Sequence, residues 1–140
     1  MIRYIGLDVG DRTIGVAVSD LLGMTAQGIT TVKRKSWEKD FLALGEIIKE
    51  YNVEKAVVGL PKNMNNTLGP QGEKTIKFAE KFHKEFGLEI IYQDERMTSI
   101  AATRTLIDAD VSRKKRKQVI DKLAAVHILQ TYLDKISRNL

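Results

Sequence analysis

Two short segments near the start of the chain alternate apolar residues with small or polar ones, and three residues separate them. In residues 5–9 the apolar side chains fall on one face, and in residues 13–19 Ile14, Val16 and Val18 do the same. A period of two is typical of a β-strand, and so short a connection joins antiparallel neighbours. The sequence therefore predicts a β-hairpin over residues 5–19, and the rest of the fold has to be built on it.

The other face of the first segment carries Asp8 between Gly6 and Gly10. Aspartate is depleted in strands, and burying its charge without a partner is costly. The two glycines leave space around the carboxylate, which suits a group that has to reach a metal ion or a phosphate. The local sequence equally allows a strand that ends at Asp8, with the carboxylate capping the turn that follows.

The rest of the chain alternates segments of strand and helix character. Apolar residues recur at helical spacing in segments that predict helices over 37–51 (with Ser36 as N-cap), 70–86, 100–107 and 118–136. Further strands are predicted over residues 24–32, 56–60 and 88–92. This order predicts an α/β fold, with a mixed five-stranded sheet between helices on both faces. Its first three strands are antiparallel and the others parallel, with the first strand in a central position.

Composition narrows the class of protein. A chain of 140 residues has the length of one typical domain, so we expect residues 1–140 to form a single domain. No cysteine is present, which excludes disulfides, thiolate catalysis and cysteine-ligated metal sites. No apolar run approaches the roughly 20 residues that span a bilayer, and the N-terminus lacks a secretory signal. We therefore expect a cytoplasmic protein without a membrane segment.

The chain is basic, with a net charge of +5 and a pI near 9.4. Its most concentrated positive charge is the run Arg113–Lys117, which lies between two segments of helical pattern. Such a run is expected to be a solvated loop, and two uses of it remain open. It could contact nucleic acid, or it could be a solvated surface without a partner.

Two further acidic residues are predicted to meet Asp8. Glu95 follows a predicted parallel strand closely, at the edge of the sheet where open α/β folds bind ligands. Asp121 lies near the inward edge of the last helix, although an aspartate early in a helix can also be favoured by the helix dipole alone. Three converging carboxylates repel one another unless cations lie between them, and oxygen ligands favour Mg²⁺ or Mn²⁺.

Four stretches of the chain match one family in order and separation, and three of them contain the acids. The stretches are Gly6–Gly10 with Arg12 and Ile14–Asp20; Val58–Pro61; Asp94–Ser99; and Asp121–Gln130. The chain resembles the YqgF family, a branch of the ribonuclease H-like superfamily similar to RuvC-type Holliday-junction resolvases. It departs from the family pattern at Lys62, where an apolar residue is usual, and at Asn65-Asn66, where the family has an Asp-Gly turn.

The resemblance implies a nuclease, a hydrolase acting on ester bonds, that matures the 5′ end of the 16S ribosomal RNA precursor in ribosome biogenesis. Asp8, Glu95 and Asp121 would be its catalytic acids and metal ligands, and we expect two-metal hydrolysis with Mg²⁺ or Mn²⁺. Contacts that position the substrate phosphates are expected from polar and basic side chains. These are Arg12, Lys62, Asn63, Arg96, Thr98, Arg113, Lys114, Lys115 and Arg116.

The expected partners are nucleic acid, as structured RNA or branched DNA, and ribosomal precursor particles, with the protein a monomer or a homodimer. One alternative is a Holliday-junction resolvase acting on branched DNA. Another is an RNA-binding assembly factor of the same fold that does not cleave, although an unused carboxylate cluster would be an electrostatic burden. An actin-like ATPase also opens with an Asp-x-Gly hairpin, but it needs a second lobe that 140 residues are not expected to supply.

Overall fold

The computed structural model describes residues 2–63, 65–95 and 113–138, with the side chains of 113–120 left out. Five strands form one sheet in the order β3-β2-β1-β4-β5. The strands are β1 (Tyr4–Val9), β2 (Thr13–Ser19), β3 (Ala26–Lys33), β4 (Lys55–Leu60) and β5 (Glu89–Asp94). Both contacts of β2 are antiparallel, whereas β4 runs parallel to β1 and to β5. The mixed sheet with a central first strand is the one that the sequence predicts.

Local capping sets the ends of the first two helices. α1 (Trp37–Tyr51) begins after Ser36, whose side chain accepts a hydrogen bond from the backbone N–H of Lys39 at 3.2 Å. α2 (Pro70–Phe86) has proline in its first turn and ends at Gly87, which has a left-handed φ of 69°. Both helices have the predicted bounds. The helix predicted over 100–107 lies outside the described residues.

The last helix is longer than predicted. α4 runs from Arg113 to Arg138, so the basic run Arg113–Lys117 is helical where a loop was expected. Arginine and lysine are good helix formers, and neither glycine nor proline interrupts the sequence from residue 113 to residue 138. A loop was expected because the positive charge is concentrated there, but the high helix propensity of lysine and arginine outweighs that charge. Of the helices in the described ranges, none is both long and apolar enough to cross a membrane.

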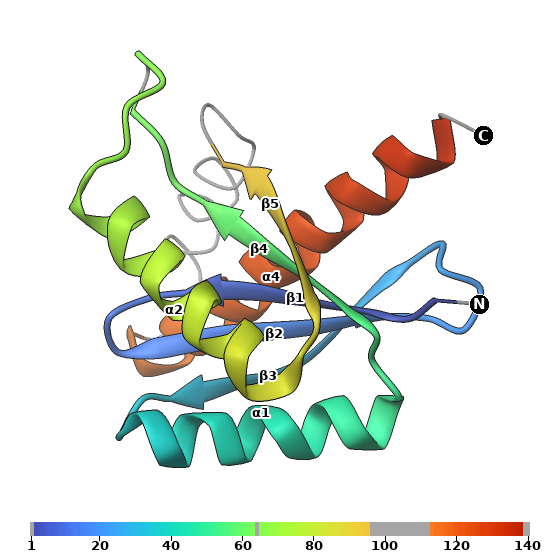
Figure 1. The fold of residues 1–140 in the computed structure, drawn as a ribbon, viewed down its shortest axis with the longest axis horizontal. Coiled ribbons are helices and arrows are strands. Elements are labelled where there is room, and N and C mark those ends of the chain that lie inside the picture. Colours follow the sequence, from blue (N-terminus) through green and yellow to red (C-terminus); the bar gives the residue numbers. More distant parts are fainter. Residues whose placement is uncertain (1, 64, 96–112, 139–140) are drawn as a thin grey trace.

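Two cores lie on opposite faces of the sheet. α1 and α2 cover the face that contains Ile5, Leu7 and Val9, together with Phe78 and Phe82 of α2. α4 covers the other face, where its small and apolar residues pack on Tyr4, Ala17 and Val57. In Figure 1, α2 lies in front of the strands, α1 runs below β3 along the bottom of the view, and α4 passes behind the strands. The even-numbered residues of β1, and Asp8 with them, therefore lie on the α4 face.

Candidate active site

Asp8 lies near the end of β1, on the face that α4 covers. Gly6, two residues earlier, faces α4 so closely that an added β-carbon would lie 2.7 Å from Leu129 Cβ and 3.1 Å from the carbonyl oxygen of Ala125. Because side chains alternate along a strand, Asp8 shares this face and is half-buried there. The carboxylate thus lies at one end of the contact between β1 and α4.

Asp121 reaches the same place from α4. Asp8 pairs with Gly15 of β2, and a β-carbon at Gly15 would overlap the backbone carbonyl of Asp121. The backbone of α4 therefore occupies the space that a side chain at position 15 would fill, directly beside Asp8. The Asp121 carboxylate accepts a hydrogen bond from the hydroxyl of Thr13, with 2.5 Å between Oγ1 and Oδ2.

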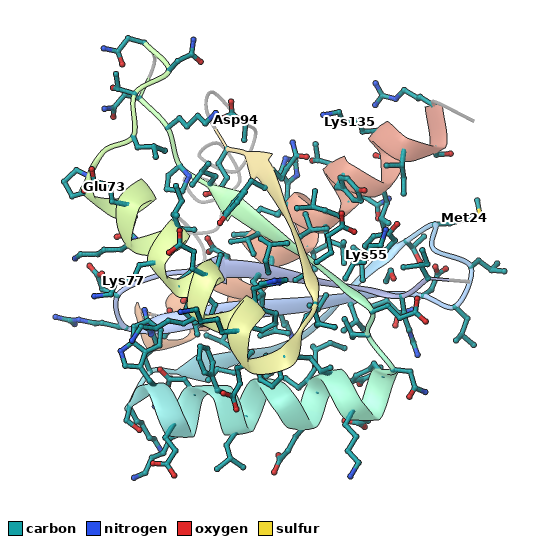
Figure 2. The ribbon with its side chains drawn as sticks, in the orientation of Figure 1. Met24, Lys55, Glu73, Lys77, Asp94 and Lys135 are labelled. Carbon is teal, nitrogen blue, oxygen red and sulfur yellow. The ribbon has the colours of Figure 1, made fainter. Side chains whose placement is uncertain are left out.

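Glu95 approaches from the other side of Asp8. Its backbone N–H donates to the carbonyl oxygen of Leu60 at 3.1 Å, so the chain stays attached to β4 beyond the end of β5. Its carboxylate lies over Gly59, where an added β-carbon would be 2.8 Å from both Cδ and Oε1. Gly59 follows Val58, the partner of Leu7, which makes it the β4 neighbour of Asp8. Figure 2 shows Asp94, the residue before Glu95, at the carboxyl end of β5.

The three acids therefore occupy adjacent positions on one edge and one face of the sheet. Asp8 lies between two glycine positions on neighbouring strands, and another acidic residue covers each of them. Strands in a sheet are about 4.8 Å apart, so the three positions span roughly 10 Å. As the side chains stand, no group of three or more His, Asp or Glu within the described ranges is arranged to hold a metal ion. The predicted shared edge is confirmed, but a preformed three-carboxylate cluster is not.

The donor chemistry at this edge fits divalent cations. Carboxylate oxygens are the hard ligands that Mg²⁺ and Mn²⁺ prefer. The glycines at 15 and 59 clear the positions on either side of Asp8, since a methyl group at either position would meet Asp121 or Glu95. Asp8, Glu95 and Asp121 are thus the residues that could hold such ions, once their side chains have rearranged around them.

Two of the predicted substrate contacts lie in the loop that follows β4. Lys62 is half-buried and Asn63 is exposed. The Asn63 side chain donates to Thr67 Oγ1 at 3.0 Å, so its amide holds the loop in shape. Asn66 has a φ of 70°, and asparagine tolerates this left-handed conformation better than most residues. The Asn65-Asn66 pair therefore still forms a turn where the family has Asp-Gly.

Arg12 is exposed in the turn between β1 and β2, four residues after Asp8. Its backbone carbonyl accepts from the N–H of Arg34 at 2.8 Å, and Arg34 also donates from its side chain to the carbonyl of Gly10 at 3.0 Å. These bonds hold the turn against the end of β3. Arg96 and Thr98 lie outside the described residues, as do the side chains of Arg113, Lys114, Lys115 and Arg116.

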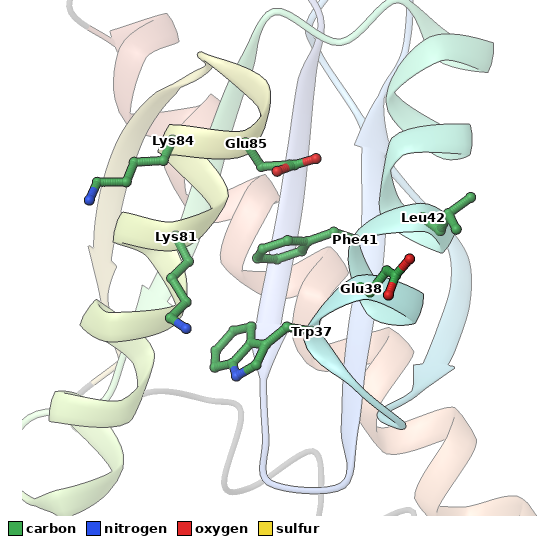
Figure 3. Close-up of a pocket in the computed structure, with 7 residues that line it drawn as sticks. All are labelled: Trp37, Glu38, Phe41, Leu42, Lys81, Lys84 and Glu85. Carbon is green, nitrogen blue, oxygen red and sulfur yellow. The ribbon is translucent and has the colours of Figure 1, made fainter.

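A separate groove of about 600 Å³ lies between α1 and α2, on the other face of the sheet. Figure 3 shows Trp37 and Phe41 of α1 facing Lys81 of α2 across it. The ammonium group of Lys81 lies 4.4 Å from the centre of the Trp37 ring, a cation–π contact. None of the candidate acids lines this groove, so it is not part of the proposed site.

Sequence reasoning missed two residues of this site, Thr13 and Gly59. Gly59 interrupts an apolar strand, and a glycine in that position is a signal of close approach by another group. Thr13 gave no such signal, because its partner Asp121 is 108 residues away along the chain.

Comparison with known proteins places the chain in a family. The sequence model of the RuvX family, described as Holliday junction resolvase, matches residues 2–135. The chain belongs to the RuvX family. RuvX and YqgF are two names for one family, so the resemblance found in the sequence is confirmed. Membership makes the protein a nuclease that hydrolyses phosphodiester bonds of nucleic acid, and such nucleases generally depend on divalent metal ions.

Relatives match over nearly the whole chain. A protein of Clostridioides difficile (strain 630), named "Putative pre-16S rRNA nuclease", is 63% identical over 132 residues, which cover 94% of each chain. A protein of the same name from Thermoanaerobacter pseudethanolicus is 61% identical, with 94% of this chain and 96% of the relative covered.

Solved structures show the same fold at low sequence identity. RuvC of Thermus thermophilus has a TM-score of 0.60 at 12% identity, with 97% of each chain covered. The Fowlpox virus resolvase bound to Holliday junction DNA has a TM-score of 0.53 at 14% identity, covering 96% of this chain and 99% of the resolvase. The mixed α/β architecture predicted from the sequence is thus shared with these structures.

Proposed function

We propose that this RuvX-family protein processes the 5′ end of the 16S ribosomal RNA precursor, with Asp8, Glu95 and Asp121 as its catalytic acids. The observation that carries the site is the placement of Asp8 between Gly15 and Gly59, with Asp121 over one glycine and Glu95 over the other. The substrate is inferred from relatives at about 60% identity that carry the name of a pre-16S rRNA nuclease.

The three carboxylates would hold Mg²⁺ or Mn²⁺ at the edge of the sheet. Bound there, a pair of ions supplies an activated water and stabilises charge on the leaving oxygen. Asp8, on a central strand with neighbours on both sides, gives the site a rigid base. Arg12 and Lys62 flank this edge and would position phosphates, with the side chains of Arg96 and Arg113–Arg116 as further predicted contacts.

The proposal treats residues 1–140 as one nuclease domain that acts in the cytoplasm on ribosomal precursor particles. A monomer can perform single-strand processing, whereas cutting a four-way junction symmetrically requires two active sites. The family description, Holliday junction resolvase, makes branched DNA the second candidate substrate. A homodimer would accompany that activity.

The test is a cleavage assay that compares the wild type with Asp8→Asn. Purified protein is given a structured RNA with a 5′-extended 16S end and, separately, a four-way DNA junction, each with Mg²⁺, Mn²⁺ or EDTA. Changing a partner of a metal ligand already costs 10–100-fold, so loss of the ligand itself should lower the rate by at least about 100-fold. Asp11→Asn, which removes an exposed carboxylate three residues away, is the control.

Each result has a defined meaning. Cleavage of the RNA at one position supports rRNA processing, and preferential cleavage of the junction supports the resolvase. Wild-type rates in Asp8→Asn would refute the assignment of the acids. Tight RNA binding by the wild type without cleavage under any metal condition would favour the assembly factor that does not cleave.

A further inference from the structure

Thr13 connects the β1–β2 hairpin to the acidic residue of α4. Its hydroxyl donates to Oδ2 of Asp121 at 2.5 Å, a short hydrogen bond to a charged acceptor. Thr13 is half-buried at the first position of β2, two residues before Gly15. The same short segment therefore contacts Asp121 twice, at its backbone through Gly15 and at its carboxylate through Thr13.

These two contacts constrain different degrees of freedom. Packing of the Asp121 carbonyl on Gly15 fixes the height and rotation of α4 above the sheet. It leaves the χ angles of the Asp121 side chain unconstrained, and the carboxylate could then sample several rotamers. The hydrogen bond from Thr13 selects among these rotamers and restrains the position of Oδ2.

The segment around Thr13 is itself held rigidly. The backbone carbonyl of Thr13 accepts from the N–H of Gly10 at 2.9 Å, which closes the turn. Arg34 donates to the carbonyl of Gly10 at 3.0 Å, and Gln71 of α2 donates to the carbonyl of Val9 at 3.1 Å. The turn is thus tied to β3 and to α2, so the Thr13 hydroxyl is presented from a fixed backbone.

From this geometry we infer that Thr13 is a positioning residue of the active site, acting through Asp121. Its hydroxyl holds one carboxylate oxygen, so that the carboxylate is oriented before a metal ion binds. The inference rests on the proposed function, because it requires Asp121 to be a metal ligand. Groups that hydrogen-bond a metal ligand orient it, and their loss typically costs 10–100-fold in metal affinity or activity.

The experiment uses Thr13→Val, which keeps the β-branched shape and loses only the hydroxyl, and Thr13→Ser, which restores it. Mn²⁺ binding to the metal-free protein is measured by calorimetry, and cleavage is measured across a Mn²⁺ titration. We expect Thr13→Val to weaken Mn²⁺ binding about 10-fold and to move the cleavage midpoint equally, with Thr13→Ser close to wild type.

Thr25→Val is a matched control. The Thr25 hydroxyl also donates to an aspartate, at 2.9 Å to Asp20 Oδ2, but in the turn at the other end of β2. Removing it deletes the same kind of bond away from the proposed site. Its Mn²⁺ midpoint should stay at the wild-type value, even if its Tm falls.

A Tm comparison without metal separates orientation from a structural role. Thr13→Val should lower the Tm of the wild type but leave that of Asp121→Ala unchanged, because the acceptor is already gone in that background. Equal Tm losses in both backgrounds would show that the bond is absent in solution. If Thr13→Val lowers the Tm only when Asp121 is present but leaves the Mn²⁺ midpoint unchanged, the hydrogen bond has a structural role only. Either result overturns the inference.

Asp121→Ala also separates this inference from the proposed function. If Asp121→Ala binds Mn²⁺ as the wild type does, Asp121 is not a ligand and the proposed site itself is wrong. If Asp121→Ala loses binding while Thr13→Val retains it fully, the site stands and only the positioning role of Thr13 fails.

Discussion

At the scale of single residues, Gly15 and Gly28 provide a matched pair under α4. A β-carbon at Gly15 would overlap the backbone of Asp121, whereas one at Gly28 would lie 2.8 Å from Cγ of Lys122, an exposed and flexible side chain. The Lys122 side chain can turn away by rotating about its χ1 angle, with Val126 Cγ2 also nearby at 3.3 Å, but the helix backbone cannot move without displacing all of α4. A side chain at Gly15 would therefore displace the helix, whereas one at Gly28 would displace only other side chains, although both glycines face α4 from the neighbouring strands β2 and β3.

We expect Gly15→Ala to lower the free energy of unfolding by about 3 kcal/mol, the upper end of the usual range of about 1–3 kcal/mol for overpacking. Gly28→Ala should change it by less than about 1 kcal/mol, because the side-chain shift is offset by the lower flexibility of alanine in the unfolded chain. Urea unfolding followed by circular dichroism measures both values. Equal losses would mean that α4 does not rest on Gly15.

The candidate acids could be predicted as residues, but their contacts could not. Asp8 and Glu95 each lie near the end of an apolar strand, which marks their positions, although the local sequence left Asp8 equally open to a role as a turn cap. The sequence also placed Asp121 on the inward edge of its helix. What it could not supply is the hydrogen bond from Thr13 or the position of the Glu95 carboxylate over Gly59. Both depend on how elements far apart in the chain come together.

At the scale of elements, the predictions succeeded where local chemistry sets the boundary. Ser36, Pro70 and Gly87 act through their own backbone or a neighbouring N–H, so the bounds of α1 and α2 follow from sequence. β3 begins at Ala26, two residues later than predicted, because the turn before it includes Met24 and Thr25. The prediction was wrong at the start of α4: it began the helix at residue 118, although Ser112, a residue type that often caps helices, directly precedes Arg113.

The turn between β2 and β3 is organised by Asp20. Its carboxylate accepts from the N–H of Met24 at 2.8 Å and from both the N–H and the hydroxyl of Thr25. The hydrogen bond from Met24 is the largest cause that lowers the pKa of Asp20 below its usual 3.8. A carboxyl with a lowered pKa in the folded state stabilises the fold above its unfolded pKa, and this contribution is lost as the pH falls through the folded value.

Asp20→Asn should therefore have a lower Tm than the wild type at pH 7, and the difference should shrink as the pH falls below about 3.8. Protonation of Asp20 in the wild type then removes the charge that the substitution removes at every pH. Thermal unfolding from pH 7 to pH 2 tests this, with Glu50→Gln, an exposed carboxylate on α1, as the control for charge. A difference that is constant across this range would contradict the assignment.

At the scale of the whole molecule, the two faces of the sheet differ in their packing. One face carries a core of large side chains, and on the other face the backbone of α4 lies close to the strands. The α1 and α2 face contains all four phenylalanines, and the ring centroids of Phe82 and Phe86 lie 4.8 Å apart. The α4 face uses alanines and glycines, so that the helix can lie near the strands. The sequence predicted helices on both faces but not this division, because it depends on which helix packs on which face.

The division predicts opposite effects of substitutions on the two faces. Phe82 is fully buried in the aromatic core, so Phe82→Leu should cost about 1–2 kcal/mol of stability while the folded protein cleaves at the wild-type rate.

Gly59→Ala should have the opposite effect, a lower cleavage rate with a smaller change in stability. The three atoms nearest to its β-carbon are Ile128 Cδ1 at 2.4 Å and Glu95 Cδ and Oε1 at 2.8 Å. All three lie at the ends of side chains, so the loss of stability should be smaller than a clash with backbone would cause. The displaced carboxylate should lower the cleavage rate by 10-fold or more, since a shift of about 1 Å in a catalytic group can cost about 100-fold. Urea unfolding and cleavage at saturating Mn²⁺, measured on the same preparations, give both quantities. Loss of activity in Phe82→Leu at a temperature where it is fully folded would show that the two faces are coupled.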